Sequence, residues 1–152
     1  METSPLLNKV LRFISIRPRS EKEVKEYIKT KLYKEKLDED KIISVTSPII
    51  SNLRNLALLD DESFAKSWAE WRLASLHPKG LRIIKMELSQ KGVSKEIIEL
   101  VLEKQEYKDM EVGAAKRVVA KQFKKVGGDP FKIKNYLYSR GFTSSSIESA
   151  ID

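Results

Sequence analysis

Residues Leu59–Ser94, LDDESFAKSWAEWRLASLHPKGLRIIKMELSQKGVS, carry the strongest structural signals in the chain. Large apolar side chains in their first half recur at intervals of four and three residues, which predicts a helix whose buried face holds Phe64, Trp68 and Trp71. The Pro-Lys-Gly sequence at 78–80 breaks this helix. A second apolar stripe then runs to Gly92, and Ser94 is placed to cap a third helix. The segment therefore predicts three short helices in succession.

The joint between two of these helices occurs a second time. Residues 91–94, Lys-Gly-Val-Ser, and residues 140–143, Arg-Gly-Phe-Thr, share a basic residue, a glycine, an apolar residue and a hydroxyl cap. In such a joint the glycine takes the left-handed conformation, the apolar residue folds back, and the hydroxyl begins the next helix. An earlier copy is degenerate, because Leu32 stands where the glycine would be. We expect an all-α fold of three tandem three-helix repeats, with boundaries at 1–59, 60–106 and 107–152.

The first repeat contains one clear helix start and one ambiguous region. Ser20 and Glu23 have the spacing of a capping box, in which each side chain accepts a hydrogen bond from the other residue's backbone N–H. Further along, Ser47-Pro48 interrupts the apolar positions between residues 42 and 56. Because proline lacks a backbone donor and restricts the preceding residue, it predicts either a kinked helix or a restart with Ser47 as the cap.

Composition argues against several classes of protein. The chain of 152 residues has no cysteine, one histidine and no apolar run near the length of a membrane span, so we expect a cytoplasmic protein without disulfides or membrane segments. It also lacks the motifs of zinc peptidases, serine hydrolases, nucleotide-binding loops and dinucleotide-binding folds. The sequence thus predicts no catalytic role, no metal site and no cofactor.

The net charge of +7 is concentrated between Val112 and Arg140, where eight basic residues face one acidic residue, Asp129. A concentrated positive field attracts polyanions, so this segment is the predicted contact with nucleic acid or an acidic surface. The candidate residues are Arg117, Lys121, Lys124, Lys125, Lys132, Lys134 and Arg140, with Arg72, Arg82 and Lys85 as further candidates on the central repeat. The plainer interpretation is a lysine-rich helix face that only contacts solvent.

Helical spacing divides the helix near 109–126 into two faces. The expected packing face holds Val112, Ala115, Val119, Phe123 and Val126, and the basic side chains of residues 117, 121, 124 and 125 lie opposite. Tyr136 and Tyr138 follow in the next helix, where stacking on exposed bases and ordinary packing remain equally open. No pattern resembles a base-reading code, so sequence-specific recognition is disfavoured.

The central segment resembles the RecX family of regulatory proteins, whose members modulate the bacterial RecA recombinase. The matching residues are Leu59-Asp60-Asp61, Phe64-Ala65, Arg72, Lys79-Gly80, Glu87-Leu88 and Lys91-Gly92. The resemblance implies an elongated, curved molecule of three tandem three-helix repeats that lies in the groove of the RecA–DNA filament. It further implies a monomer without a cofactor that contacts protein and DNA and most often inhibits ATPase, recombinase and coprotease activities.

A different class of function remains open, namely a stand-alone helical DNA-binding module with a transcriptional or architectural role. That alternative predicts tight DNA binding by the isolated protein and a preference among duplex sequences. A filament regulator instead predicts weak, non-specific DNA binding alone and an effect that requires RecA.

Overall fold

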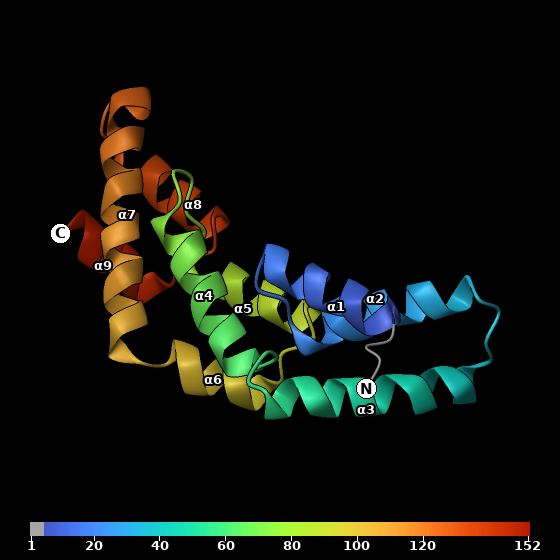
Figure 1. The fold of residues 1–152 in the computed structure, drawn as a ribbon. Coiled ribbons are helices and arrows are strands. Elements are labelled where there is room, and N and C mark those ends of the chain that lie inside the picture. The colour runs from blue at the N-terminus through green and yellow to red at the C-terminus, as the bar shows by residue number, and fades with distance from the viewer. Residues whose placement is uncertain (1–4) are drawn as a thin grey trace. The chain divides into compact units, whose positions relative to one another are not determined.

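The computed structural model describes residues 5–152, and of Val126 the backbone alone; over this range the chain is entirely α-helical (Figure 1). The helices are α1 Pro5–Ile16, α2 Glu21–Tyr33, α3 Glu39–Asn55, α4 Asp61–Ala74, α5 Leu81–Gln90, α6 Lys95–Leu102, α7 Gln105–Val126, α8 Pro130–Ser139 and α9 Ser144–Ile151. The described residues thus form three successive groups of three helices, as the sequence predicts. None of these helices has both the length and the apolar character that a bilayer crossing requires.

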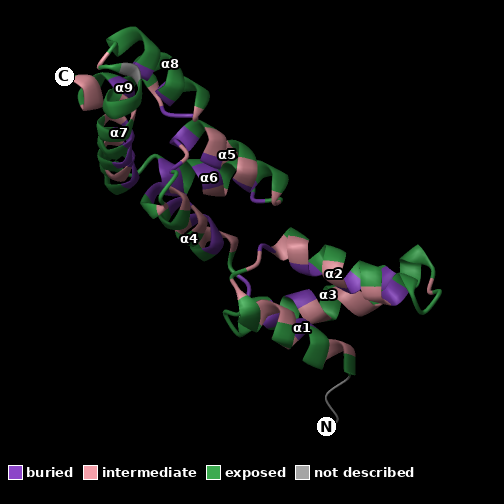
Figure 2. Cartoon of the chain, turned by 90° about the horizontal axis from the view of Figure 1, so that it is seen from above, coloured by how far each residue is buried: buried purple, intermediate pink, exposed green. Residues whose placement is uncertain are grey.

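The chain divides into two compact units. Unit 1 comprises the described residues up to Phe64 together with Lys91–Val93, and unit 2 comprises Ala65–Gln90 and Ser94–Asp152. Buried residues lie mainly on the sides of helices that face other helices of the same unit, and exposed residues cover the outer sides (Figure 2). The second and third helix groups fall almost wholly in unit 2. The repeat boundaries and the elongated, curved shape stay predictions.

Unit 1 packs α1 and α3 against α2 around an aliphatic core formed by Val10, Val24, Ile28, Leu32, Ile42, Ile50, Leu53 and Leu59. The start of α2 confirms the capping box: the Ser20 hydroxyl accepts from the N–H of Glu23, and the Glu23 carboxylate accepts from the N–H of Ser20, each at 3.2 Å. Ser20 is fully buried and also donates to the carbonyl of Lys91 at 2.7 Å. One side chain therefore serves a helix start and a tertiary contact.

Helix α3 runs unbroken through Pro48, so the predicted restart at Ser47 is wrong. The helix begins earlier, where the Asp38 side chain accepts from the N–H of Lys41 at 2.9 Å. A proline inside a helix costs about 3 kcal/mol. The buried aliphatic residues on the two sides of the proline are Ile42, Ile50 and Leu53. Because the burial of each contributes about 1.5–3 kcal/mol, their burial outweighs the cost of the proline.

Helix α4 buries a different face from the one predicted. Its fully buried positions beyond Phe64 are Ala65, Ala69 and Leu73, which recur every four residues. Trp68 is half-buried, and Trp71 is 55% exposed, so the predicted tryptophan stripe is wrong. Alanine allows close approach of neighbouring backbone, and the larger rings are left at the edge and on the surface.

Unit 2 groups α7, α8 and α9, and Figure 1 shows α8 and α9 beside the long α7. The repeated joints have the predicted conformation, with φ of 83° at Gly92 and 91° at Gly141. The hydroxyls of Ser94 and Thr143 accept from backbone N–H groups three residues later, at 3.2 and 3.4 Å. Because side chains are strained at such positive φ values, glycine is required at both turns.

Candidate nucleic-acid interface

The ten predicted site residues all lie in unit 2, but they do not form one surface. Six of them form hydrogen bonds or ion pairs within the protein, and the other four, all lysines, form none with the residues that the structure describes. The six come from α4, α5, α7 and the end of α8, and their partners are backbone carbonyls, carboxylates and aromatic rings. The distinction follows from tertiary contacts that residue spacing does not reveal.

Two basic residues of α7 bind carbonyls at and beyond the end of α4. Arg117 donates through its guanidinium to the carbonyl of Leu73. Lys121 donates through Nζ to the carbonyl of Leu76 at 3.0 Å. The last carbonyls of a helix have no partner within the helix and carry its negative dipole end, so these cations stabilise the end of α4.

Arg140, which follows α8, completes the same arrangement. Its guanidinium donates to the carbonyls of His77 and Pro78 at 2.9 and 3.3 Å. Its own carbonyl accepts from the N–H of Gly80 at 2.9 Å. Arg117, Lys121 and Arg140 therefore fix the connection between α4 and α5, and each has a structural role that the sequence analysis did not foresee.

On the central repeat, Arg72 forms an ion pair with Glu87 of α5 through two hydrogen bonds, one of them 2.9 Å long. The same carboxylate accepts from the indole N–H of Trp68 at 3.1 Å. The guanidinium also lies 4.8 Å from the centre of the Trp71 ring. Arg72 thus joins α4 to α5.

The two remaining candidates on α5 are also engaged. Arg82 donates to the carbonyl of Tyr138 at 2.5 Å, and its guanidinium carbon lies 4.1 Å from the centre of that residue's ring. Lys85 pairs with Glu103 at 2.9 Å. The hydrogen bond from Lys85 is the main reason that the pKa of Glu103 lies below its ordinary value.

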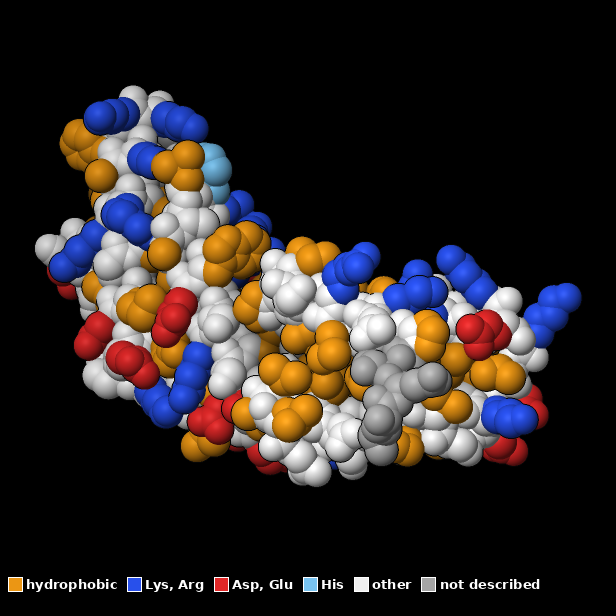
Figure 3. All heavy atoms as spheres, in the orientation of Figure 1, with side chains coloured by type: hydrophobic (Ala, Val, Ile, Leu, Met, Phe, Trp, Pro, Cys, Tyr) orange, Lys and Arg blue, Asp and Glu red, His pale blue; other side chains and the backbone are white. Residues whose placement is uncertain are grey.

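The four lysines without such contacts form what we call the lysine surface: Lys124, Lys125, Lys132 and Lys134. All four are exposed, and none makes a hydrogen bond or ion pair with any residue that the structure describes. They lie at the end of α7 and on α8, on either side of the Gly127-Gly128 turn. Figure 3 shows basic side chains gathered at this end of α7, at the top of the view, and acidic side chains on that face near the other end. This surface is the best candidate for a polyanion contact.

The packing face of α7 is rotated from the prediction. Phe123 is 59% exposed, and Val112 and Val119 are only partly buried. Among the side chains of α7 that the structure describes, the buried ones are Tyr107, Glu111, Ala114, Ala115 and Val118, so Ala115 alone of the predicted face is confirmed as buried. The side chain of Val126 lies outside the described residues. The buried face was not recognised in the sequence because it includes a glutamate; residues 107, 111, 115 and 118 otherwise have ordinary core spacing.

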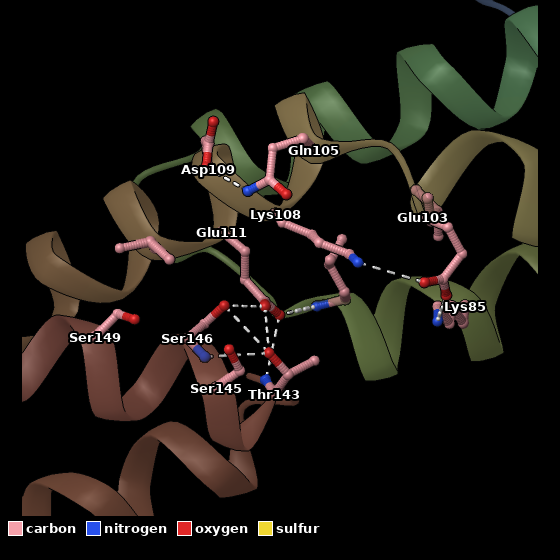
Figure 4. Close-up of a pocket in the computed structure, with 13 residues that line it drawn as sticks. Lys85, Glu103, Gln105, Lys108, Asp109, Glu111, Thr143, Ser145, Ser146 and Ser149 are labelled. Carbon is pink, nitrogen blue, oxygen red and sulfur yellow. Dashed lines mark hydrogen bonds and ion pairs between the residues drawn. The ribbon is translucent and has the colours of Figure 1, made fainter.

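Glu111 is the most important residue that the sequence analysis missed. Its side chain is fully buried and accepts from the N–H of Leu81 at 2.6 Å and from the N–H and hydroxyl of Thr143 at 3.3 and 2.7 Å. The hydroxyl of Ser146 donates to it as well (Figure 4). One carboxylate thus satisfies the first backbone donor of α5 and binds the cap of α9. An acid four residues after Tyr107 in a stripe of small apolar residues was the available signal.

A cleft of about 520 Å³ lies beside Glu111 and is lined by side chains of α5, α7 and α9 (Figure 4). Its charged groups are largely paired with one another. Glu103 binds Lys85 at 2.9 Å and Lys108 at 3.6 Å, and Gln105 donates to Asp109 at 2.8 Å. This internal pairing makes the cleft a weaker candidate for ligand binding than the lysine surface.

Comparison with known proteins connects these features to one family. Residues 60–102 match the second three-helix domain of RecX. The chain is 30% identical over 152 residues to the regulatory protein RecX of Caldanaerobacter subterraneus subsp. tengcongensis, and the match covers all of this chain and 72% of that protein. It is 32% identical over 151 residues to a regulatory protein RecX of Streptococcus pneumoniae, where the match covers 95% of this chain but 54% of the relative.

Solved structures of RecX proteins resemble this chain in fold as well. The crystal structure of RecX from Lactobacillus salivarius superposes with a TM-score of 0.76 at 29% identity, covering 96% of this chain and 92% of that one. A second crystal structure, of a regulatory protein RecX, gives a TM-score of 0.72 at 26% identity, covering 95% of this chain and 69% of the other. The likeness therefore extends over nearly the whole chain.

Proposed function

Because the chain belongs to the RecX family of regulatory proteins, we propose that it binds the filament that a bacterial RecA recombinase forms on DNA and thereby regulates the recombinase. We expect binding to inhibit the ATPase, recombinase and coprotease activities of the filament. The observation that carries the proposal is the match over the full chain to a regulatory protein RecX.

The lysine surface supports the DNA part of this proposal. Lys124, Lys125, Lys132 and Lys134 are exposed and have no acidic partner among the described residues, so phosphates can approach them without displacing an existing contact. Neutralised phosphates release counterions, and affinity then falls with salt by a log–log slope of about 0.7 per contact on single strands and about 0.9 on duplex DNA. Four contacts give weak binding by the protein alone, which suits a partner that supplies further contacts through RecA.

The same proposal accounts for the other expectations. The protein acts as a monomer without metal or cofactor, in the cytoplasm where its recombinase works. Its relatives carry the name regulatory protein, which suits a role without chemistry of its own. The activity resides in binding, and the paired basic residues of unit 2 keep the helices in position for it.

The test is the steady-state ATPase rate of the cognate RecA on single-stranded DNA, with this protein titrated from far below to equal stoichiometry. Excess DNA removes simple competition for sites. We expect the rate to fall at substoichiometric protein, and sequestration of DNA cannot produce a fall at that ratio. An unchanged rate with active protein would contradict filament regulation and would favour a stand-alone DNA-binding module.

A matched pair of variants locates the interface in the same assay. The double substitution Lys124→Gln and Lys125→Gln should shift the titration to higher protein concentration. The substitution Lys95→Gln removes an exposed charge from α6, whose nearest acidic group, Glu99, lies 3.9 Å away, and should leave the titration unchanged. Equal shifts for both variants would contradict a specific role for the lysine surface.

A further inference from the structure

The lysine surface is interleaved with exposed aromatic rings. Within sixteen residues of α7 and α8 the exposed fractions are 59% for Phe123, 72% for Phe131, 38% for Tyr136 and 58% for Tyr138. Isolated apolar side chains on a surface are ordinary, but several large rings in one short basic segment are not. The rings remain to be explained, because phosphate binding alone requires only the lysines.

Helical spacing places two of these rings on one face of α8. Ile133 and Leu137 are buried on the inner side of the helix. Phe131, Lys134 and Tyr138 follow at positions i, i+3 and i+7, which bring the three side chains to a common outward face. At 1.5 Å per residue the two rings are about 10 Å apart along the axis, with the lysine between them. We call these three residues the α8 aromatic face.

Tyr136 belongs to the other side of the helix. It lines a small cavity together with the 76–78 connection and Lys125 of α7. Packing against its own unit therefore accounts for Tyr136. Of the two roles that the sequence left open for these tyrosines, ordinary packing suits Tyr136, and stacking on bases stays open for Tyr138.

Two of the exposed rings are supported from behind. The guanidinium of Arg82 lies 4.1 Å from the centre of the Tyr138 ring and covers one side of it. The Phe123 ring rests on the turn before α8, since a Cβ on Gly128 would lie 2.6 Å from the nearest ring atom. A ring held on one side and open on the other loses little conformational freedom when a flat partner stacks on it.

We infer that the α8 aromatic face is a stacking site for the bases of an unpaired nucleic-acid strand. This inference rests on the proposed function, and it specifies that the DNA bound at this face is single-stranded. Rings among lysines are the usual means of binding single strands, where the lysines track phosphates and every base offers a flat surface. Bases inside a duplex are already stacked, so the site selects strands whose bases are free. A protein partner is the less favoured occupant, because the face carries positive charge and no acidic residue.

The test compares binding of an oligothymidine and of an abasic strand of equal length and charge, measured by fluorescence anisotropy without RecA. We expect the full chain to bind the abasic strand at least about five-fold more weakly, since stacking on one aromatic contributes about 1–3 kcal/mol per base. The double substitution Phe131→Leu and Tyr138→Leu should bind both strands equally, at the lower affinity. The control Tyr33→Leu, which replaces an exposed tyrosine of unit 1, should keep the wild-type ratio.

Equal binding of the two strands by the unaltered protein would overturn the inference, and this result depends on no substitution. A wild-type ratio retained by the double variant would overturn it as well. If the unaltered protein binds the two strands equally and the double variant nevertheless loses the RecA effect, the inference is overturned and the face is assigned to a protein contact. An unchanged RecA ATPase rate with strong abasic discrimination would instead contradict the proposed function and support the stacking site.

Discussion

Replacing Glu111 should test how far unit 2 depends on one buried carboxylate. In Glu111→Ala the N–H groups of Leu81 and Thr143 lose their acceptor in a buried site. Each unsatisfied buried donor costs about 1–3 kcal/mol, so we expect the free energy of unfolding to fall by about 2–6 kcal/mol in total. That is a large share of the stability of a typical domain.

The isosteric change Glu111→Gln should cost much less. One carboxylate oxygen accepts from the two N–H groups, and the other accepts from the hydroxyls of Thr143 and Ser146. A glutamine can place its carbonyl on the N–H side and its amide on the hydroxyl side, because hydroxyls can rotate to accept. What it loses is the negative charge at the starts of α5 and α9, which contributes about 1–2 kcal/mol.

Urea unfolding followed by circular dichroism gives the three free energies, and hydrogen exchange in α9 shows where the loss occurs. Glu106→Gln is the control, since Glu106 is an exposed carboxylate of the same helix and should change stability by about 0.5 kcal/mol or less. A cost of less than about 1 kcal/mol for Glu111→Ala would refute the assigned role. If Glu111→Ala and Glu111→Gln lowered the free energy of unfolding equally, the claim that the accepted hydrogen bonds contribute more than the negative charge would be refuted.

Three further predictions concern unit 2. Burial, followed by the charge of Glu70, raises the pKa of Tyr107 from its ordinary value of 10.0 to about 12. The stability that the protonated Tyr107 contributes is therefore full below pH 10 and is lost as the pH rises to about 12. Phenolate absorbance should show one tyrosine that ionises at higher pH than the others, and Tyr107→Phe should abolish this loss of stability at alkaline pH. The substitutions Lys124→Gln and Lys125→Gln together should reduce the log–log salt slope of single-strand binding by about 1.4 without lowering stability. Arg117→Gln should do the reverse, costing about 1 kcal/mol of stability and leaving the slope unchanged.

Local signals predicted the helix joints well, because the chemistry of a joint is contained in a few adjacent residues. The positive φ of Gly92 and Gly141 is confirmed, as is the capping box of Ser20 and Glu23. Whether Pro48 interrupts its helix depended instead on the burial of Ile42, Ile50 and Leu53 against other helices, which local rules do not contain. The tryptophan stripe of α4 was wrong for a related reason, since size and spacing do not reveal where a neighbouring helix requires alanine.

The candidate site was predictable as a region but not residue by residue. Charge counting located the basic segment, yet Arg117, Lys121 and Arg140 serve carbonyls at positions 44 to 63 residues earlier in the chain. A cation that neutralises a helix end and one that awaits a phosphate look alike in a sequence. Only tertiary contacts separate them, and whether the remaining lysines bind DNA stays a prediction.

The Glu111 cluster also sets an order of events during synthesis. The carboxylate draws on a donor thirty residues before it and on donors more than thirty residues after it. While the chain is being made, α5 and Glu111 of α7 are synthesised before the residues of α9 that complete the cluster. A buried carboxylate that lacks three of its four donors is unfavourable, so unit 2 should reach its final packing only once α9 has been made. Products that stop short of Thr143 would leave Glu111 with the N–H of Leu81 as its one remaining donor among those described, so their unit 2 should be less stable than that of the full chain.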